Sequence, residues 1–302
     1  MSTTPLAPAA GLGAQRTLSR ITDKNHLGPD AQVDDKALIF VPTDPHLTDP
    51  FLALVEDWMS VPGFDWHPHR GLETVTTVVD GVLEHGDNLG HVGKLEPGEV
   101  QWMTAGRGVI HRELAYRDER ARVLQMWLNL PAEHKLTTPG YQDLTDSGMA
   151  RIIRPGVRID VHAGTVDGIH GSARTHSPVQ GVVATLEPGS SYNLTVPADH
   201  RLFAHAMSGD LLVGGRPLTQ GQVGWSDPHR GVPATSLQLA APATAGQPVR
   251  VMVYSGRPLK EPVALGGPFV MNSKAQITQA FTDFHTGRFG TVPKQARVDY
   301  DL

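Results

Sequence analysis

Short apolar runs that alternate with turn residues fill the chain from about residue 37 to residue 255. Residues 74–79 are all β-branched, and an Asp80-Gly81 turn separates them from the next apolar run. β-Branched side chains suit the half-buried surface of a strand, and Asp-Gly is a strong hairpin signal. Many short strands at this spacing predict an all-β protein, built as a compact antiparallel sandwich or barrel.

Two segments of the first strand-rich region recur in the second. Residues 95–102 resemble residues 218–225, and residues 80–83 resemble residues 208–211 at a similar offset. Two such matches indicate a duplicated barrel. We therefore predict four parts: a loose N-terminal arm (residues 1–36), a first barrel (37–135), a second barrel (136–265) and a C-terminal helix with a tail (266–302). The two barrels should be joined through residues 131–147.

One helix is predicted, near the end of the chain. Ser273 and Gln276 have the spacing of a capping box, and Gly287 can supply a left-handed C-terminal cap. Between them, apolar residues recur at spacings of three and four, which forms one apolar face: Ile277, Ala280, Phe281 and Phe284. We expect this helix to pack on a barrel in a structural role.

Two short patterns in the first barrel carry the candidate chemistry: His-Pro-His at 67–69 and His-Arg-Glu at 111–113. Alternate residues of a strand share a face, so two strands on neighbouring barrel walls would bring four donors together: His67, His69, His111 and Glu113. This set suits iron, manganese, nickel, copper or zinc better than calcium or magnesium. An octahedral ion would keep two open positions, and its affinity should fall in acid.

The second barrel lacks these donors. Aligning the two repeats on their turn glycines places weak donors or apolar residues at the four ligand positions: Thr195, Pro197, Ala234 and Ser236. The nearest stronger donor is Gln238. We therefore predict a metal-binding N-terminal barrel and a metal-free C-terminal barrel.

Three other polar residues of the first barrel rank lower. By strand parity Glu73 shares the face of His69, so we expect a reserve ligand or an acceptor for one of the ligands. His85 and His91 flank a turn, and we expect both to be solvated.

Composition narrows the remaining functions. The net charge is −5 and no basic run occurs, which argues against direct nucleic-acid binding. The absence of cysteine excludes disulfides, thiolate metal sites and a cysteine nucleophile. We see neither a secretory signal nor an apolar stretch of the ~20 residues that a membrane helix needs, so we expect a soluble cytoplasmic protein.

Four segments resemble the pirin family of two-cupin proteins: residues 49–52, 67–75, 97–113 and 267–272. The resemblance implies two cupin barrels, each a double-stranded β-helix or jelly roll, with the C-terminal helix packed outside. It also implies one metal, usually iron(II), in the N-terminal cupin only, held by His67, His69, His111 and Glu113. The chain departs from the family at Arg112, where serine or alanine is common.

The resemblance implies two alternative functions. Some members are similar to quercetin 2,3-dioxygenases, which open a flavonol ring with dioxygen. Others bind a transcription factor or a metabolic enzyme as regulators, and such a protein partner is our alternative. We favour the dioxygenase, with an aromatic or enol substrate and with Glu113 as the catalytic residue that accepts the substrate proton.

Overall fold

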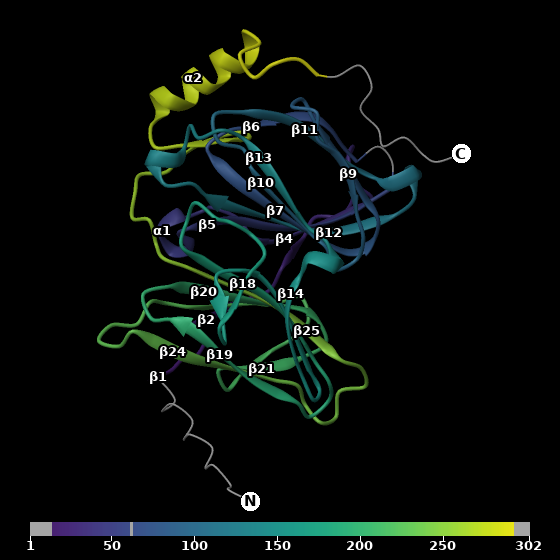
Figure 1. Ribbon diagram of the computed structural model, residues 1–302, viewed down its shortest axis with the longest axis vertical. Helices are drawn as coiled ribbons and strands as arrows, with labels where there is room; N and C mark the ends of the chain where they lie inside the picture. Colours follow the sequence, from purple (N-terminus) through teal and green to yellow (C-terminus); the bar gives the residue numbers. More distant parts are fainter. Residues whose placement is uncertain (1–13, 61–62, 293–302) are drawn as a thin grey trace, which may run out of the picture.

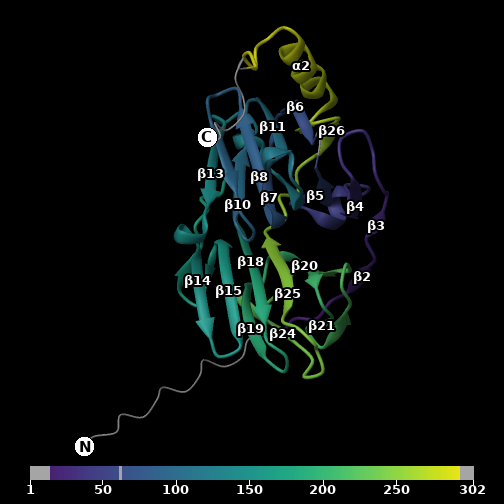
Figure 2. The ribbon, with the colours of Figure 1, turned by 90° about the vertical axis from the view of Figure 1, so that its right-hand side faces the viewer.

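The protein is a stack of two β-barrels with one helix on the outer side of the first barrel (Figure 1). The computed structural model describes residues 14–60 and 63–292. Figure 2, a view from the side, shows the same two lobes with the first barrel lying between the second barrel and helix α2 (Lys274–His285). The predicted all-β, two-cupin fold is confirmed.

The first barrel consists of a large and a small antiparallel sheet. In spatial order the large sheet contains β13 (Gly140–Leu144), β10 (Val100–Thr104), β7 (Leu72–Gly81), β12 (Ala121–Asn129), β5 (Phe51–Met59), β4 (Asp35–Phe40) and β3 (Asn25–His26). The small sheet contains β6 (Phe64–His69), β11 (Val109–Ala115), β8 (Leu83–Asp87) and β9 (Val92–Leu95).

The second barrel repeats this plan. Its large sheet contains β14 (Ala150–Arg154), β15 (Val157–Ala163), β18 (Val179–Leu186), β25 (Val249–Gly256), β20 (Arg201–Ser208), β23 (Val223–Ser226) and β2 (Arg20–Thr22). Its small sheet contains β1 (Ala14–Gln15), β24 (Ala234–Ala240), β21 (Leu211–Val213) and β22 (Arg216–Leu218), and β19 (Ser191–Pro197) also pairs with β24.

A few short elements connect or cover the barrels. They are helix α1 (Pro45–Thr48), the hairpin of β16 (Thr165–Val166) and β17 (Ile169–His170), the hairpin of β26 (Ala264–Gly266) and β27 (Phe269–Met271), and three 3₁₀ turns, Tyr116–Asp118, Ala132–His134 and Asp146–Gly148. In the part of the chain that the structure describes, no helix combines the length and the hydrophobicity needed to cross a bilayer.

The internal repeat falls on equivalent turns of the two barrels. Gly81 at the end of β7 has φ 70°, and its counterpart Gly209 just after β20 has φ 71°. Gly98 and Gly221, which precede β10 and β23, have φ 90° and 88°. Glycine adopts these left-handed angles without the steric cost of a side chain. The repeated residues are therefore the turn residues of a duplicated barrel.

The boundaries of the barrels differ from those expected. Strand β13 pairs with β10 along its whole length, so the first barrel continues past residue 135 into the segment expected as a connection. Strands β1 and β2 of the expected loose arm pair with strands of the second barrel, and Arg16 is buried there, donating to the carbonyl of His200 at 2.8 Å. Residues 1–13 of that arm lie outside the described residues. These pairings are long-range, and no local pattern predicts them.

An apolar cluster joins the two large sheets across the interface between the barrels. Phe51 of the first barrel meets Phe203 of the second at 5.0 Å between ring centroids, and Phe40 meets Trp225 at 4.9 Å. Both pairs are edge-to-face, an arrangement that adds about 0.5–1.5 kcal/mol to the effect of burial. We expect the barrels to move as one body.

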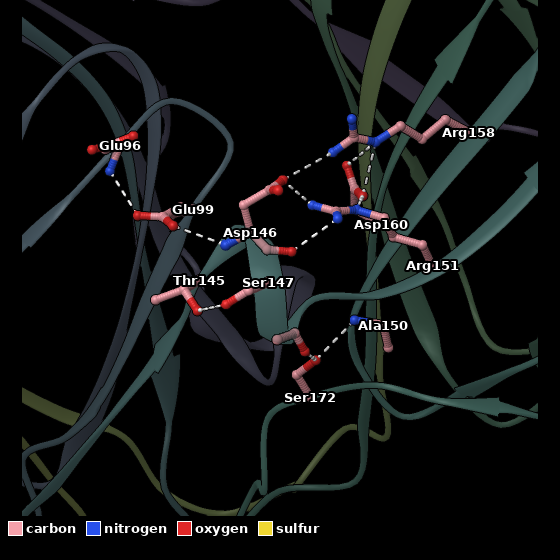
Figure 3. A network of polar contacts seen from close by, with 11 residues as sticks. Glu96, Glu99, Thr145, Asp146, Ser147, Ala150, Arg151, Arg158, Asp160 and Ser172 are labelled. Carbon is pink, nitrogen blue, oxygen red and sulfur yellow. Dashed lines mark hydrogen bonds and ion pairs between the residues drawn. The ribbon is translucent and has the colours of Figure 1, made fainter.

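A polar network fastens the segment between the barrels (Figure 3). The backbone N–H of Asp146 donates to Glu99 Oε1 of the first barrel at 2.8 Å, while the Asp146 carboxylate pairs with Arg151 of the second. Arg151 and Arg158 both donate through Nε to Asp160 Oδ1, at 2.8 and 3.0 Å. The segment is thus held to both barrels.

Helix α2 covers the outer face of the small sheet of the first barrel. Ser273 caps it by accepting from the N–H of Gln276, while the Gln276 side chain accepts from Asn272 N, so only half of the expected capping box forms. Three residues of the predicted apolar face, Ile277, Ala280 and Phe284, pack on the barrel in one cluster with Ile110, Phe269, Phe289 and Trp66. The fourth, Phe281, lies at the edge with 37% of its surface exposed, and its ring contacts Phe269 at 4.9 Å. The predicted helix and its structural role are confirmed.

Candidate metal centre

Three of the four predicted ligands meet inside the first barrel. Strands β6 and β11 are antiparallel neighbours, and His67 lies directly opposite His111 in their ladder, with His69 two residues further on. One ring nitrogen of each imidazole lies within 4.8 Å of those of the other two. The short spacing within one strand and the pairing of two strands therefore form a cluster that could hold one metal ion.

The tautomers of two of these imidazoles suit a metal. His67 Nδ1 lies 2.7 Å from the Asp65 carbonyl and His69 Nδ1 lies 3.2 Å from the Pro268 carbonyl. A carbonyl only accepts, so each Nδ1 donates and each Nε2 keeps its lone pair for a metal. His69 Nε2 and both ring nitrogens of His111 are buried without a partner. Buried polar atoms without a partner are costly, and a metal ion would satisfy the acceptor nitrogen of each imidazole.

Burial also keeps the cluster in its ligand form. Loss of hydration lowers the pKa of His69 to about 3, with a further contribution from His67. The same cause holds the pKa of His111 well below its usual value. Both imidazoles are therefore neutral at physiological pH, which is the protonation state that binds metals.

Glu113 lies next to this cluster but outside the group whose ligand atoms converge. The pairing of β11 with β6 shifts between His111 and Glu113, because three residues of β6 span two of β11, while the pairing of β11 with β8 stays regular there. The carboxylate accepts from Thr76 Oγ1 at 3.0 Å and from Gln125 Nε2 at 2.6 Å. Its role as fourth ligand remains a prediction.

Glu73 does not join the centre. Its Oε1 accepts from Thr104 Oγ1 at 2.7 Å, on the face of β10 that carries Trp102, and Trp102 belongs to the core between the barrels. The parity argument for Glu73 was wrong because the chain turns between β6 and β7, where Gly71 has φ 78°. Burial raises the pKa of Glu73 to about 7.

His85 is buried, contrary to the expectation of a solvated side chain. Only 2% of its surface is exposed, and it lies opposite Glu113 in the pairing of β8 with β11. Side chains directly opposite each other share a face, so His85 also belongs to the barrel interior. His91 is half exposed and contacts Asp87 at 2.7 Å. Side chains alternate along β8, and the residue opposite Glu113 must face the interior. This alternation was the signal that could have revealed the buried position of His85.

Arg112 points away from the interior. Its guanidinium donates to Glu84 at 3.1 Å and lies over the Trp66 ring at 5.3 Å. The residue at which this chain departs from the family pattern therefore packs on the outer side of the small sheet, beside helix α2.

The interior of the second barrel is apolar where that of the first is polar. Its core is an aliphatic cluster that includes Ile159, Val182, Leu194, Leu237 and Val251. Thr195 faces Ser236 across β19 and β24, as His67 faces His111. Thr195 is nevertheless exposed, and the buried pair beside it is Leu194 opposite Leu237, so aliphatic side chains rather than metal donors face the interior here.

A C-terminal strap, residues 264–271, supports the metal centre from outside both barrels. Besides the Pro268 contact to His69, Val270 N donates to the Arg70 carbonyl at 3.0 Å. The ammonium of Lys135 is buried and donates to the carbonyls of Gly71 and Val270, at 2.7 and 2.9 Å. Lys135 therefore ties the strap to the end of the ligand-bearing strand β6.

Two cupin barrels, with an imidazole cluster in the first and an aliphatic core in the second, define a two-cupin protein with one candidate metal centre. The chain belongs to the pirin family: the Pirin model matches residues 31–128, and the Pirin C-terminal cupin domain matches residues 181–290.

Known proteins support this assignment. Pirin-1 of Arabidopsis thaliana is 40% identical over 250 residues, which are 82% of this chain and 85% of that protein. The crystal structure of a quercetin 2,3-dioxygenase from Acinetobacter baumannii has a TM-score of 0.81 and 30% identity, covering 93% of this chain and all of that one. A bacterial pirin from Escherichia coli in complex with nickel(II) has a TM-score of 0.62 at 19% identity, covering 79% of this chain and all of that one.

Proposed function

We propose that this protein is a metal-dependent dioxygenase that opens the ring of a flavonol or a related enol. The observation that carries the proposal is the cluster of three imidazoles in the polar barrel, two of which, His69 and His111, have buried nitrogens without a partner. The similarity to a protein named quercetin 2,3-dioxygenase supports the reaction class. The regulatory alternative rests on the family resemblance alone.

We further propose that the ion is iron(II). His67, His69 and His111 would hold it, with Glu113 as the fourth ligand. The nickel(II) complex of the Escherichia coli pirin supports a first-row ion of this kind. When bound, the metal would lower the pKa of the substrate hydroxyl and place the substrate beside dioxygen.

Glu113 is the proposed acceptor of the substrate proton. Thr76 and Gln125 each donate to one of its two oxygens, which fixes the plane of the carboxylate beside His111. Each carboxylate oxygen has two lone pairs, so one hydrogen bond leaves room for a second donor. The hydroxyl of a bound enol could therefore pass its proton to the oxygen that does not coordinate the metal, without displacing Thr76 or Gln125.

The test is oxygen uptake by iron(II)-reconstituted protein supplied with quercetin. We expect uptake with a ring-opened product in the wild type, and its loss in His67→Ala and in Glu113→Gln. The matched control is His170→Ala, an exposed histidine of the second barrel, which should keep full activity. Ring opening that persists after the metal is removed would contradict the proposal.

A further inference from the structure

A second group of polar side chains faces the interior of the first barrel beside the metal centre. His85 on β8 lies opposite Glu113, and Tyr141 on β13 lies opposite Met103 on β10. The rings of His85 and Tyr141 are stacked, with centroids 5.7 Å apart and planes 14° apart. Tyr141 also packs on the small apolar cluster that contains Met103.

Most polar atoms of this stacked pair have no hydrogen-bond partner. Both ring nitrogens of His85 and the hydroxyl oxygen of Tyr141 are buried without a hydrogen bond. His85 Nε2 makes a long ion-pair contact of 3.5 Å with Asp143 Oδ2, while Gln101 donates to the other oxygen, Oδ1, at 3.1 Å. Unsatisfied buried groups are rare because each one costs free energy, so the two atoms of this pair that lack any polar partner, His85 Nδ1 and the Tyr141 hydroxyl, require an explanation.

The backbone around the pair leaves space for the imidazole. Gly93 of β9 lies opposite His85, and a Cβ atom built on it would lie 2.7 Å from His85 Nε2. Any side chain at this position would therefore displace the imidazole. Because Gly93 has no side chain, His85 can face the interior next to Glu113.

The pair lies within reach of the imidazole cluster. Glu113 is opposite His85 and two residues from His111 on the same strand, so His85 and His111 are diagonal neighbours across the ladder. Diagonal neighbours are about 7–8 Å apart. A fused two-ring aromatic molecule spans such a distance. One ligand can therefore contact the His85–Tyr141 pair and the imidazole cluster at the same time and lie alongside Glu113.

We propose that His85 and Tyr141 bind the far end of the substrate, through a hydroxyl or carbonyl oxygen remote from the one at the metal centre. A neutral imidazole and a phenol each offer one donor and one acceptor, which suits a phenolic hydroxyl. The substrate class is therefore a planar aromatic enol with a second oxygen on its distal ring. This assignment rests on the proposed function and specifies its substrate.

The test compares two flavonols that bind zinc-loaded protein without turnover, followed by fluorescence titration. Quercetin carries distal hydroxyls, whereas 3-hydroxyflavone lacks them. We expect the wild type to bind quercetin about tenfold more tightly, the gain expected from hydrogen bonds to otherwise unpartnered groups. Tyr141→Phe and His85→Leu should abolish this preference and leave 3-hydroxyflavone affinity and zinc content unchanged. Tyr192→Phe, in the second barrel, is the matched control.

Each other outcome overturns the assignment in a recognisable way. Equal affinity of the wild type for both flavonols, or an undiminished preference in Tyr141→Phe, would show that the pair binds internal water only and would leave the dioxygenase proposal standing. Zinc-loaded wild type that binds neither flavonol would overturn both proposals. Tyr141→Phe removes only one oxygen and keeps the stack, so the test survives even where His85→Leu does not fold.

Discussion

Replacing Glu73 by glutamine should stabilise the protein in alkaline solution and leave metal binding intact. Glu73 is fully buried, and its Oε2 atom has no partner. Burial raises the pKa of this carboxyl from 4.5 to about 7. Because the pKa is higher in the folded state, the stabilisation that accompanies the protonated form is fully present below pH 4.5 and is lost as the pH rises through 7.

The size of the effect follows from the two pKa values. One pKa unit corresponds to about 1.36 kcal/mol, so the ionised carboxylate costs roughly 3 kcal/mol at pH 8.5 and only about 0.4 kcal/mol at pH 4.5. Glutamine has nearly the same shape and does not ionise. The quantity to compare is the free energy of unfolding of Glu73→Gln minus that of the wild type. This difference should be larger at pH 8.5 than at pH 4.5 by roughly 3 kcal/mol.

Urea denaturation of the metal-free proteins at these two pH values measures the difference. The comparison between pH values cancels any fixed cost of the new amide. Glu96→Gln, at an exposed turn, is the matched control and should show no such pH dependence. Elemental analysis should find equal metal in Glu73→Gln and wild type. An equal change in stability at both pH values would refute the burial argument, and loss of metal would make Glu73 a ligand after all.

Two further predictions concern the buried histidines and the strap. Burial lowers the pKa of His162 and His205 to about 4, so the unfolded chain binds protons that the folded one does not, and metal-free protein should lose stability as the pH falls from 6.5 towards 4. Because protonation of Glu73 stabilises the fold over the same range, the measurement uses the Glu73→Gln variant, and an unchanged melting temperature of that variant between pH 7 and pH 5 would contradict this. Lys135→Met should weaken zinc binding at least tenfold in a chelator competition, because the strap that carries Pro268 loses its ammonium anchor. Exposed Lys274→Met is the control, and equal affinities would show that the strap does not orient the ligand.

Local patterns predicted much of this architecture. Turn glycines and β-branched runs are local signals, so the duplicated barrel and the helix from Ser273 could be predicted without tertiary information. The spacing of His67 and His69 sufficed because both lie within one uninterrupted strand. Pairing with His111 required only that two strands be neighbours.

The failures occurred where the alternation of a strand is interrupted or where contacts are long-range. A left-handed glycine between β6 and β7 moved Glu73 to the other face. His85 was missed because its burial depends on which strand lies opposite. The pairing of β13 with the first barrel depends equally on a distant partner.

The carbonyl that orients His69 comes from residue 268, far later in the chain than the ligands themselves. During synthesis the first barrel leaves the ribosome long before this carbonyl and the helix that follows it. A nascent first barrel therefore presents His69 without the acceptor that selects its metal-binding tautomer. We expect metal loading to follow completion of the polypeptide rather than to guide its folding, so the bound ion would report that the whole chain has been made.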